Sequence, residues 1–197
     1  MKVHGTRLSG NCYKVRLLLE LLGEPYTWNE IDLLAGDTRT PEFAQLNPNG
    51  KVPVVELASG ERLTESNAIL NYLADGTSYL PTDRLDRARV LQWQFFEQYS
   101  HEPYIAVARF IQLFEGLPEH RRAEFEAKQA GGHKALKVME QHLAREPFLA
   151  AGCPTIADLS LFAYTHVAED GGFQLGGYPA IGAWLDRVRD LDGFVPM

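Results

Sequence analysis

The spacing of apolar and polar residues divides the chain into two parts near residue 77. In the first part, short apolar runs alternate with segments in which apolar residues recur every three or four positions. The runs "KVHGT" (2–6), "YTWNEID" (26–32) and "VPVVEL" (52–57) are typical of strands. The segment "NCYKVRLLLELL" (11–22) is typical of a helix, and Gly23 is a stop signal directly after it.

The remaining signals of the first part continue this alternation. "PEFAQLN" (41–47) predicts a short helix that ends in the turn "NPNG". "VPVVEL" and "ERLT" (61–64), joined by "ASG", predict a hairpin, and "SNAILNYLAD" (66–75) predicts a closing helix. The order β-α-β-(α)-β-β-α indicates a small mixed sheet with helices on its faces.

Strand patterns end beyond residue 78, and long helical patterns follow the connector "YLPTDR". They cover 84–114, 119–144, 156–169 and 180–189. In "PTIADLSLF", Thr155 and Asp158 have the spacing of a capping box. The predicted fold class is therefore an α/β domain at residues 1–77, followed by an all-helical domain at residues 84–197.

Composition narrows the functional classes. The 197 residues are 45% hydrophobic and 23% charged, with a net charge of −7, which argues against a nucleic-acid-binding surface. The first residues, "MKVHGTRLSG", lack the apolar core of a signal peptide, and no run is long enough to span a membrane. The two cysteines and six histidines show no ligand spacing, so we predict no metal and a reduced, cytoplasmic protein.

Three segments are candidates for chemistry. The first is "VPVV", where Pro53 interrupts an apolar strand pattern although it cannot donate a backbone hydrogen bond. One interpretation is a cis peptide bond that turns the backbone so that Val52 exposes its N–H and C=O. The other is a trans proline at the start of an edge strand.

The second segment is "RLSGNCYKV", which leads into the first helix. Ser9, Asn11 and Cys12 lie where backbone N–H groups and the helix dipole favour negative charge. A thiolate held there would be stabilised, and a hydroxyl or amide donor would stabilise it further. Alternatively, Ser9 or Asn11 only caps the helix, and Cys12 is a small buried hydrophobic residue.

The third segment is "LTESNAILNYL", where two polar residues open a helix. Ser66 is a candidate helix cap, and Glu65 precedes it. A carboxylate beside exposed N–H groups could hold a ligand that carries both a positive and a negative charge.

In this order, and followed by a helical domain, these segments resemble the cytosolic glutathione S-transferases over essentially the whole chain. "SNAIL" at 66–70 is similar to the family's glutathione-site segment, "NPNGKVPVVEL" to its cis-proline segment, and "TIADLSLF" to a capping segment of its helical domain. The resemblance implies a thioredoxin-like N-terminal domain, glutathione as co-substrate and an activity toward small electrophiles.

The resemblance also implies a role for each candidate residue in binding glutathione. Glu65 would pair with the γ-glutamyl ammonium, and Ser66 at the helix end would bind the adjoining carboxylate. Val52, before Pro53, would bind the cysteinyl backbone like an added strand. Lys51 and Arg39 are candidates for the glycine carboxylate.

Three residues are candidates for activating the glutathione thiol. Ser9 matches the hydroxyl of theta-like and zeta-like members, and we expect it to be the hydrogen-bond donor. Asn11, followed by "YKV", resembles the loop of nu-like, disulfide-reducing members, and it is a helper or a rival. Cys12 lies later in the loop than the cysteine of the beta and omega classes, and we expect it to be structural.

The electrophile would bind at the predicted helix 84–114, where Tyr104, Ala108 and Arg109 are candidates. We interpret Phe95, Phe96 and Phe110 on the same helix as core residues.

The predicted function is conjugation of glutathione to small hydrophobic electrophiles. Glutathione-dependent reduction of disulfides or peroxides, or a non-catalytic module that binds glutathione or a partner protein, are the alternatives. The family resemblance further implies a homodimer. The net charge and the absence of a membrane-length apolar run predict no nucleic acid and no membrane as partner.

Overall fold

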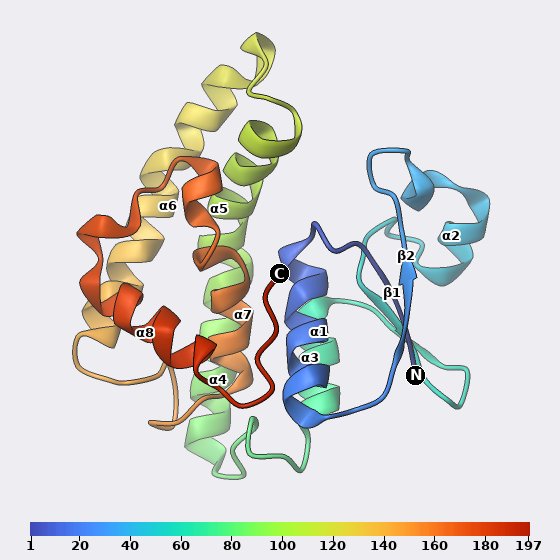
Figure 1. Cartoon of the computed structure of the whole chain (residues 1–197), viewed down its shortest axis with the longest axis horizontal. Helices are drawn as coiled ribbons and strands as arrows, with labels where there is room; N and C mark the ends of the chain where they lie inside the picture. Colours follow the sequence, from blue (N-terminus) through green and yellow to red (C-terminus); the bar gives the residue numbers. More distant parts are fainter. The chain divides into compact units, whose positions relative to one another are not determined.

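The computed structural model describes all residues, 1–197, and they form two compact units (Figure 1). The first unit contains Met1–Asp75 and the C-terminal segment Leu191–Met197, and the second contains Gly76–Asp190. We expected residues 191–197 in the helical domain, but they pack on the first unit. The Tyr13 hydroxyl donates a hydrogen bond to the Val195 carbonyl oxygen (2.7 Å), and the Arg16 guanidinium donates one to the carbonyl of Pro196.

A four-stranded mixed sheet forms the centre of the first unit. Its strands are β1 (Lys2–Gly5), β2 (Thr27–Glu30), β3 (Val54–Glu56) and β4 (Arg62–Leu63), in the order β2-β1-β3-β4. β1 pairs with β2 in parallel and with β3 antiparallel, and β3 and β4 form the expected hairpin. The mixed sheet predicted from the sequence is thus confirmed.

The first unit's helices are α1 (Gly10–Leu22), α2 (Pro41–Leu46) and α3 (Ser66–Ala74), with a short 3₁₀ turn, η1 (Asp37–Arg39). Successive strand residues point to opposite faces, so Val54 and Val55 belong to different clusters. Val55 packs with Val3 of β1, Leu19 of α1 and Ile69 of α3, all of them fully buried. On the other face Val54 joins a second cluster with Ile31 and with Phe43 of α2. α1 and α3 therefore share one face of the sheet, and α2 covers the other (Figure 1).

The second unit is helical. Its α-helices are α4 (Arg84–Phe96), α5 (Glu102–Arg109), α6 (Arg122–Leu143), α7 (Ile156–Thr165) and α8 (Pro179–Arg189). The π-helical turns η2 (Glu97–His101) and η3 (Phe110–Phe114) and the 3₁₀ turns η4 (Glu119–Arg121), η5 (Ala168–Gly171) and η6 (Leu175–Gly177) connect them. None of the helices is both long and apolar enough to cross a bilayer.

The single helix expected at 84–114 is interrupted by η2 and η3. Pro103 lies in the first turn of α5, and because proline lacks an N–H and crowds the preceding turn, a regular helix does not continue through it. The core prediction for Phe95 is wrong, because its side chain is 70% exposed; Phe110 is also partly exposed, at 38%. Phe95 lies on the outer side of α4, where no other element of the chain covers it.

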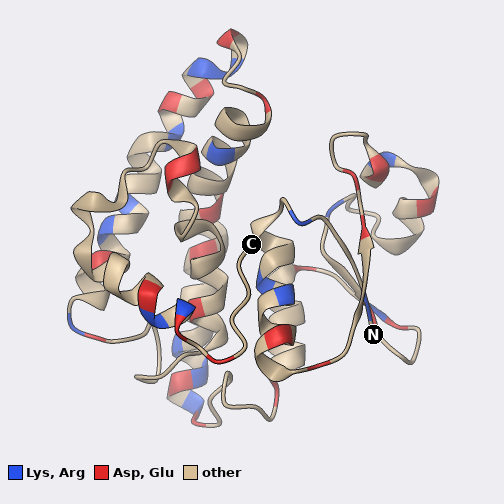
Figure 2. Ribbon diagram, in the orientation of Figure 1, with Lys and Arg blue, Asp and Glu red and all other residues tan.

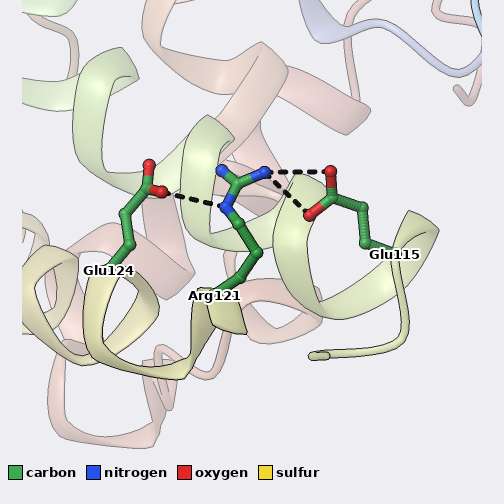
Figure 3. A network of polar contacts seen from close by, with 3 residues as sticks. All are labelled: Glu115, Arg121 and Glu124. Carbon is green, nitrogen blue, oxygen red and sulfur yellow. Dashed lines mark hydrogen bonds and ion pairs between the residues drawn. The ribbon is translucent and has the colours of Figure 1, made fainter. Parts of the chain in front are cut away.

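Charged residues in the second unit form local pairs, and acidic and basic positions are interspersed along its helices (Figure 2). A larger network lies between η3 and α6 (Figure 3). Arg121 Nη1 donates to both carboxylate oxygens of Glu115 (2.9 Å each), and its Nε donates to Glu124 (2.9 Å). These hydrogen bonds of the Arg121 guanidinium stabilise the turn in which Gly116 and Leu117 adopt positive φ angles of 72° and 51°.

The centre of the second unit is α7, in which every residue is buried. The predicted capping box is present at its start: Thr155 Oγ1 accepts a hydrogen bond from the N–H of Ala157, and Asp158 Oδ2 accepts one from the N–H of Thr155 (2.9 Å). Asp158 Oδ1 also accepts hydrogen bonds from the N–H of Leu149 and from Trp184 Nε1, both at 2.9 Å. Burial raises the pKa of the Asp158 carboxyl, and these hydrogen bonds lower it only in part.

Replacing Asp158 should therefore destabilise the second unit strongly. Asp158→Ala leaves buried donors on Leu149, Thr155 and Trp184 without their acceptor, and we expect the free energy of unfolding to fall by about 3 kcal/mol or more. Urea unfolding measures this change. The matched control is Asp186→Ala, whose side chain is 73% exposed and which should change stability by about 0.5 kcal/mol or less. Equal effects of the two substitutions would contradict the role given to Asp158.

Candidate functional site

The start of α1 presents a hydroxyl group at a helix N-terminus. Ser9 is the N-cap residue, and its Oγ accepts a hydrogen bond from the N–H of Cys12 (3.4 Å). Accepting that bond uses a lone pair, so the hydroxyl proton can still be donated to a ligand. Ser9 is half-buried. Ser9 therefore caps α1, as one interpretation of the sequence suggested. The same hydroxyl group can still donate its proton to a ligand thiolate.

Cys12 lies beneath this loop and has no exposed surface. A Cβ atom placed on Gly5 would lie 2.9 Å from its Sγ, which shows how closely β1 approaches the thiol. Burial raises the pKa of the Cys12 thiol to about 11, although hydrogen bonds to Thr6 and Ser9 oppose the rise. At neutral pH the thiol is therefore protonated, and a protonated, buried thiol is a poor nucleophile.

A hydrogen-bonded bridge joins α1 to the first residue of α3. Ser66 Oγ donates to Asn11 Oδ1 (3.2 Å) and accepts a hydrogen bond from Lys14 Nζ (3.4 Å). Ser66 is only 6% exposed, and Lys14 has no exposed surface at all. Asn11 and Ser66, which are 55 positions apart in the sequence, thus meet at two neighbouring helix N-termini.

Sequence reasoning did not identify Lys14. The signal was its position: a residue three places after Asn11 on α1 lies on the same side of the helix.

Glu65, and not Ser66, occupies the N-cap position of α3. The expectation that Ser66 caps the helix is wrong, because the Ser66 hydroxyl bonds to Asn11 and Lys14, which lie outside α3. Glu65 is exposed and has φ 63° and ψ 109°, a region that side-chain-bearing residues rarely adopt. Such a conformation costs about 1–3 kcal/mol and is found mainly at functional sites.

The peptide bond between Val52 and Pro53 is cis, as the first interpretation of "VPVV" predicted. The buried Asn47 side chain holds the preceding turn: its Nδ2 donates to the Lys51 carbonyl oxygen (2.8 Å), and its Oδ1 accepts from the N–H of Asn49 (3.0 Å). Val52 is half-buried, and the Lys51 side chain is exposed. The turn thereby fixes the backbone from which Lys51 and Val52 project.

The second candidate cation, Arg39, lies at the end of η1 and is exposed. The loop before it is held by Asp32, whose Oδ1 accepts hydrogen bonds from the N–H groups of Leu34 and Ala35 (2.9 Å each). Arg39 and Lys51 therefore both project into solvent from ordered turns of the first unit.

The three candidate electrophile residues lie on α5 in the second unit. Tyr104 packs against Gly131 of α6, where its ring leaves no room for a side chain. Ala108 is fully buried, and Arg109 Nε forms an ion pair with Asp170 Oδ2 at 2.9 Å. Packing thus occupies Ala108 and Arg109, while Tyr104 keeps part of its surface exposed.

A thioredoxin-like sheet unit with two helix N-termini joined by Asn11 and Ser66, together with a helical unit, defines the class of glutathione-dependent transferase folds. Comparison with known families agrees. The model of the glutathione S-transferase N-terminal domain matches residues 8–75, and that of the glutathione S-transferase C-terminal domain matches residues 122–187. The chain belongs to the glutathione S-transferase family.

Individual relatives extend this comparison. The crystal structure of a glutathione S-transferase from Pseudomonas fluorescens has a TM-score of 0.97 and 59% identity, over 99% of this chain and 97% of that one. A maleylacetoacetate isomerase from Rhizobium meliloti is 36% identical over 94% of this chain and 90% of its own length. A maleylacetoacetate isomerase from Methylobacterium extorquens AM1, crystallised with malonate and glutathione, has a TM-score of 0.82 and 30% identity, over 98% of this chain and 94% of that one.

Proposed function

We propose that this protein is a glutathione transferase that binds glutathione at the N-termini of α1 and α3 and activates its thiol for attack on small electrophiles. The observation that carries the proposal is the Ser66–Asn11 hydrogen bond, which holds the two helix N-termini together. Both helix ends attract anions, and bound glutathione offers two in suitable places, the γ-glutamyl carboxylate and the thiolate.

The γ-glutamyl end would bind at the start of α3. Its carboxylate would accept hydrogen bonds from the N–H groups of the first turn of α3, beginning at Ser66. Its ammonium group would pair with the Glu65 carboxylate, which the strained backbone holds at the mouth of the helix. Strain at an exposed charged residue is unexplained by packing, which supports a binding role for Glu65.

The rest of the tripeptide would lie along the turn before β3. Val52 would offer its N–H and C=O to the cysteinyl backbone, in the manner of an added strand. The glycine carboxylate would find a cation in Lys51 or Arg39, both of which are exposed on the first unit.

The thiol would then lie at the start of α1. A thiol with a pKa near 8.5 is only a few per cent ionised at neutral pH, and lowering the pKa by about 1.5 units makes it roughly half ionised. Ser9 supplies a hydroxyl proton at the helix end. Asn11 turns its carbonyl oxygen to Ser66, so the remaining polar atom of its amide, Nδ2, is a donor.

A second candidate function is glutathione-dependent isomerisation. The Rhizobium meliloti and Methylobacterium extorquens relatives, both named maleylacetoacetate isomerase, favour it. Such a reaction would use the same thiolate as a nucleophile that adds to the substrate and is later expelled, so the site on the first unit serves either activity.

A substrate profile separates these functions. Purified protein would be assayed with glutathione and a haloaromatic electrophile, an organic peroxide, a small disulfide and a cis-configured maleyl compound. Turnover of the haloaromatic compound is the expected result. Turnover of the disulfide alone would favour the reductase, turnover of the maleyl compound alone the isomerase, and glutathione binding without turnover a non-catalytic module.

Removing the charge of Glu65 should weaken the binding of glutathione. Glu65→Gln leaves the ligand ammonium without its charged partner, so the affinity should fall by about 1.5–3 kcal/mol, whereas turnover at saturating glutathione should change much less. Isothermal titration calorimetry measures the affinity. Glu61→Gln, an exposed change in the β3–β4 hairpin, is the control. An unchanged affinity of Glu65→Gln would place the γ-glutamyl group elsewhere.

Removing the Ser9 hydroxyl should instead raise the pKa of the bound thiol toward its free value. The rate of Ser9→Ala should therefore fall most at neutral pH and recover as the pH rises, which a pH–rate profile measures. Thr40→Ala is the control, because Thr40 caps α2 through the N–H of Phe43 (3.2 Å), so the variant loses a helix cap away from the thiol. If Asn11→Ala shifts the pH–rate profile and Ser9→Ala does not, Asn11 and not Ser9 is the donor to the thiolate.

We also propose that the protein forms a homodimer through the outer side of α4 and η2. Leu91 and Phe95 of α4 and Tyr99 of η2 recur every four residues and are 41%, 70% and 85% exposed. Exposed apolar rows of this kind mark interaction surfaces. Phe95→Glu should convert the dimer to a monomer in sedimentation velocity at micromolar concentration, and Leu113→Glu, also at an exposed apolar residue, should not. A monomeric wild-type protein would refute the proposal.

A further inference from the structure

We propose that Lys14 is a positioning residue, which fixes the γ-glutamyl subsite at Ser66 and, through Ser66, the amide of Asn11 beside the thiol. The inference rests on the glutathione-binding function proposed above. It adds a residue that does not touch the ligand and acts through two that do.

The burial of Lys14 is the first observation. Its side chain has no exposed surface, although lysine is among the residues least often fully buried. Taking an ammonium group out of water costs several kcal/mol before any compensation. Its Nζ lies 3.4 Å from Ser66 Oγ, at the opening of α3. A buried lysine that donates a hydrogen bond to a residue of the proposed site points to a role in that site.

The direction of the hydrogen bonds is the second observation. The Ser66 hydroxyl accepts from the Lys14 ammonium, which has only donors, and therefore turns its own proton to another acceptor. That acceptor is Asn11 Oδ1, at 3.2 Å. The Lys14 ammonium thereby determines which end of the Asn11 amide faces Ser66: the oxygen faces Ser66, and the nitrogen, a donor, is the other end.

Loss of the Lys14 ammonium would remove this constraint. Ser66 Oγ could then accept a hydrogen bond from Asn11 Nδ2, and the amide would turn its oxygen toward the thiol. An acceptor there disfavours a thiolate, so the thiol would ionise at higher pH. The positive charge of Lys14 also lies at the positive end of the α3 dipole, where it increases the attraction for a carboxylate.

Two substitutions separate the donor from the charge. Lys14→Met removes both, so the dissociation constant for glutathione should rise about tenfold and the pH–rate profile should shift to higher pH. Lys14→Gln keeps a donor without the charge, so the affinity should still fall while the pH–rate profile shifts less. A purely structural lysine would change stability without moving the pH–rate profile.

The same network can be broken from its other end. Ser66→Ala removes the acceptor of the Lys14 hydrogen bond, and adding Lys14→Met to it should produce little further shift in the pH–rate profile. If Lys14→Met does not fold, the same double-mutant cycle can be measured with Lys14→Gln and Ser66→Ala, and it still tests whether Lys14 acts through Ser66. Lys2→Met, the same change at an exposed position of β1, is the control for the loss of a lysine charge.

Two outcomes would overturn the inference alone. One is a folded Lys14→Met protein with wild-type affinity and an unmoved pH–rate profile, while Glu65→Gln still weakens binding. The other is a double variant, Lys14→Gln with Ser66→Ala, in which the effects of the two substitutions on affinity and on the pH–rate profile are independent and simply combine. A wild-type protein that does not bind glutathione would instead refute the proposed function, and the role of Lys14 with it.

Discussion

The packing of α1 and α3 on one face of the sheet is the constraint from which the candidate site arises. Val3 and Val55 of the sheet contact Leu19 of α1 and Ile69 of α3 in one apolar cluster. Burial of these side chains, worth about 1.5–3 kcal/mol each, fixes the separation of the two helices. Their N-termini consequently lie within reach of one hydrogen bond, between Asn11 and Ser66. The polar chemistry of the site thus depends on apolar packing beneath it.

Two unusual features meet at this site. The backbone of Glu65 adopts a strained conformation, and the side chain of Lys14 is fully buried. Glu65 is the N-cap residue of α3, and Lys14 donates a hydrogen bond to Ser66, the first residue of α3. Both features therefore lie at the α3 N-terminus. Other elements of the first unit follow local rules: Gly23 ends α1 in the left-handed conformation, and Thr40 caps α2. Two exceptions close to one helix N-terminus are typical of a functional site.

Much of the fold could be predicted from the sequence because its signals are local. The 3.6-residue period of α1 and the Thr155–Asp158 capping box each depend on neighbouring residues. The residue pattern around Pro53 left cis and trans open, and the family resemblance favoured the cis bond that the structure contains. The partners of Ser66 could not be predicted in this way, because Asn11 and Lys14 reach it only through the tertiary packing of two helices. Phe95 was misjudged for a similar reason: helical spacing shows that a face is apolar, and only the whole fold shows whether anything covers it.

The attachment of Leu191–Met197 to α1 makes the first unit discontinuous in sequence. During synthesis, residues 1–75 leave the ribosome long before the segment that binds Tyr13 and Arg16 exists. The second unit is made in the interval, and the first unit acquires its last contacts only afterwards. The first unit therefore cannot acquire its full set of contacts until the helical unit has been synthesised, which links the completion of one unit to the synthesis of the other.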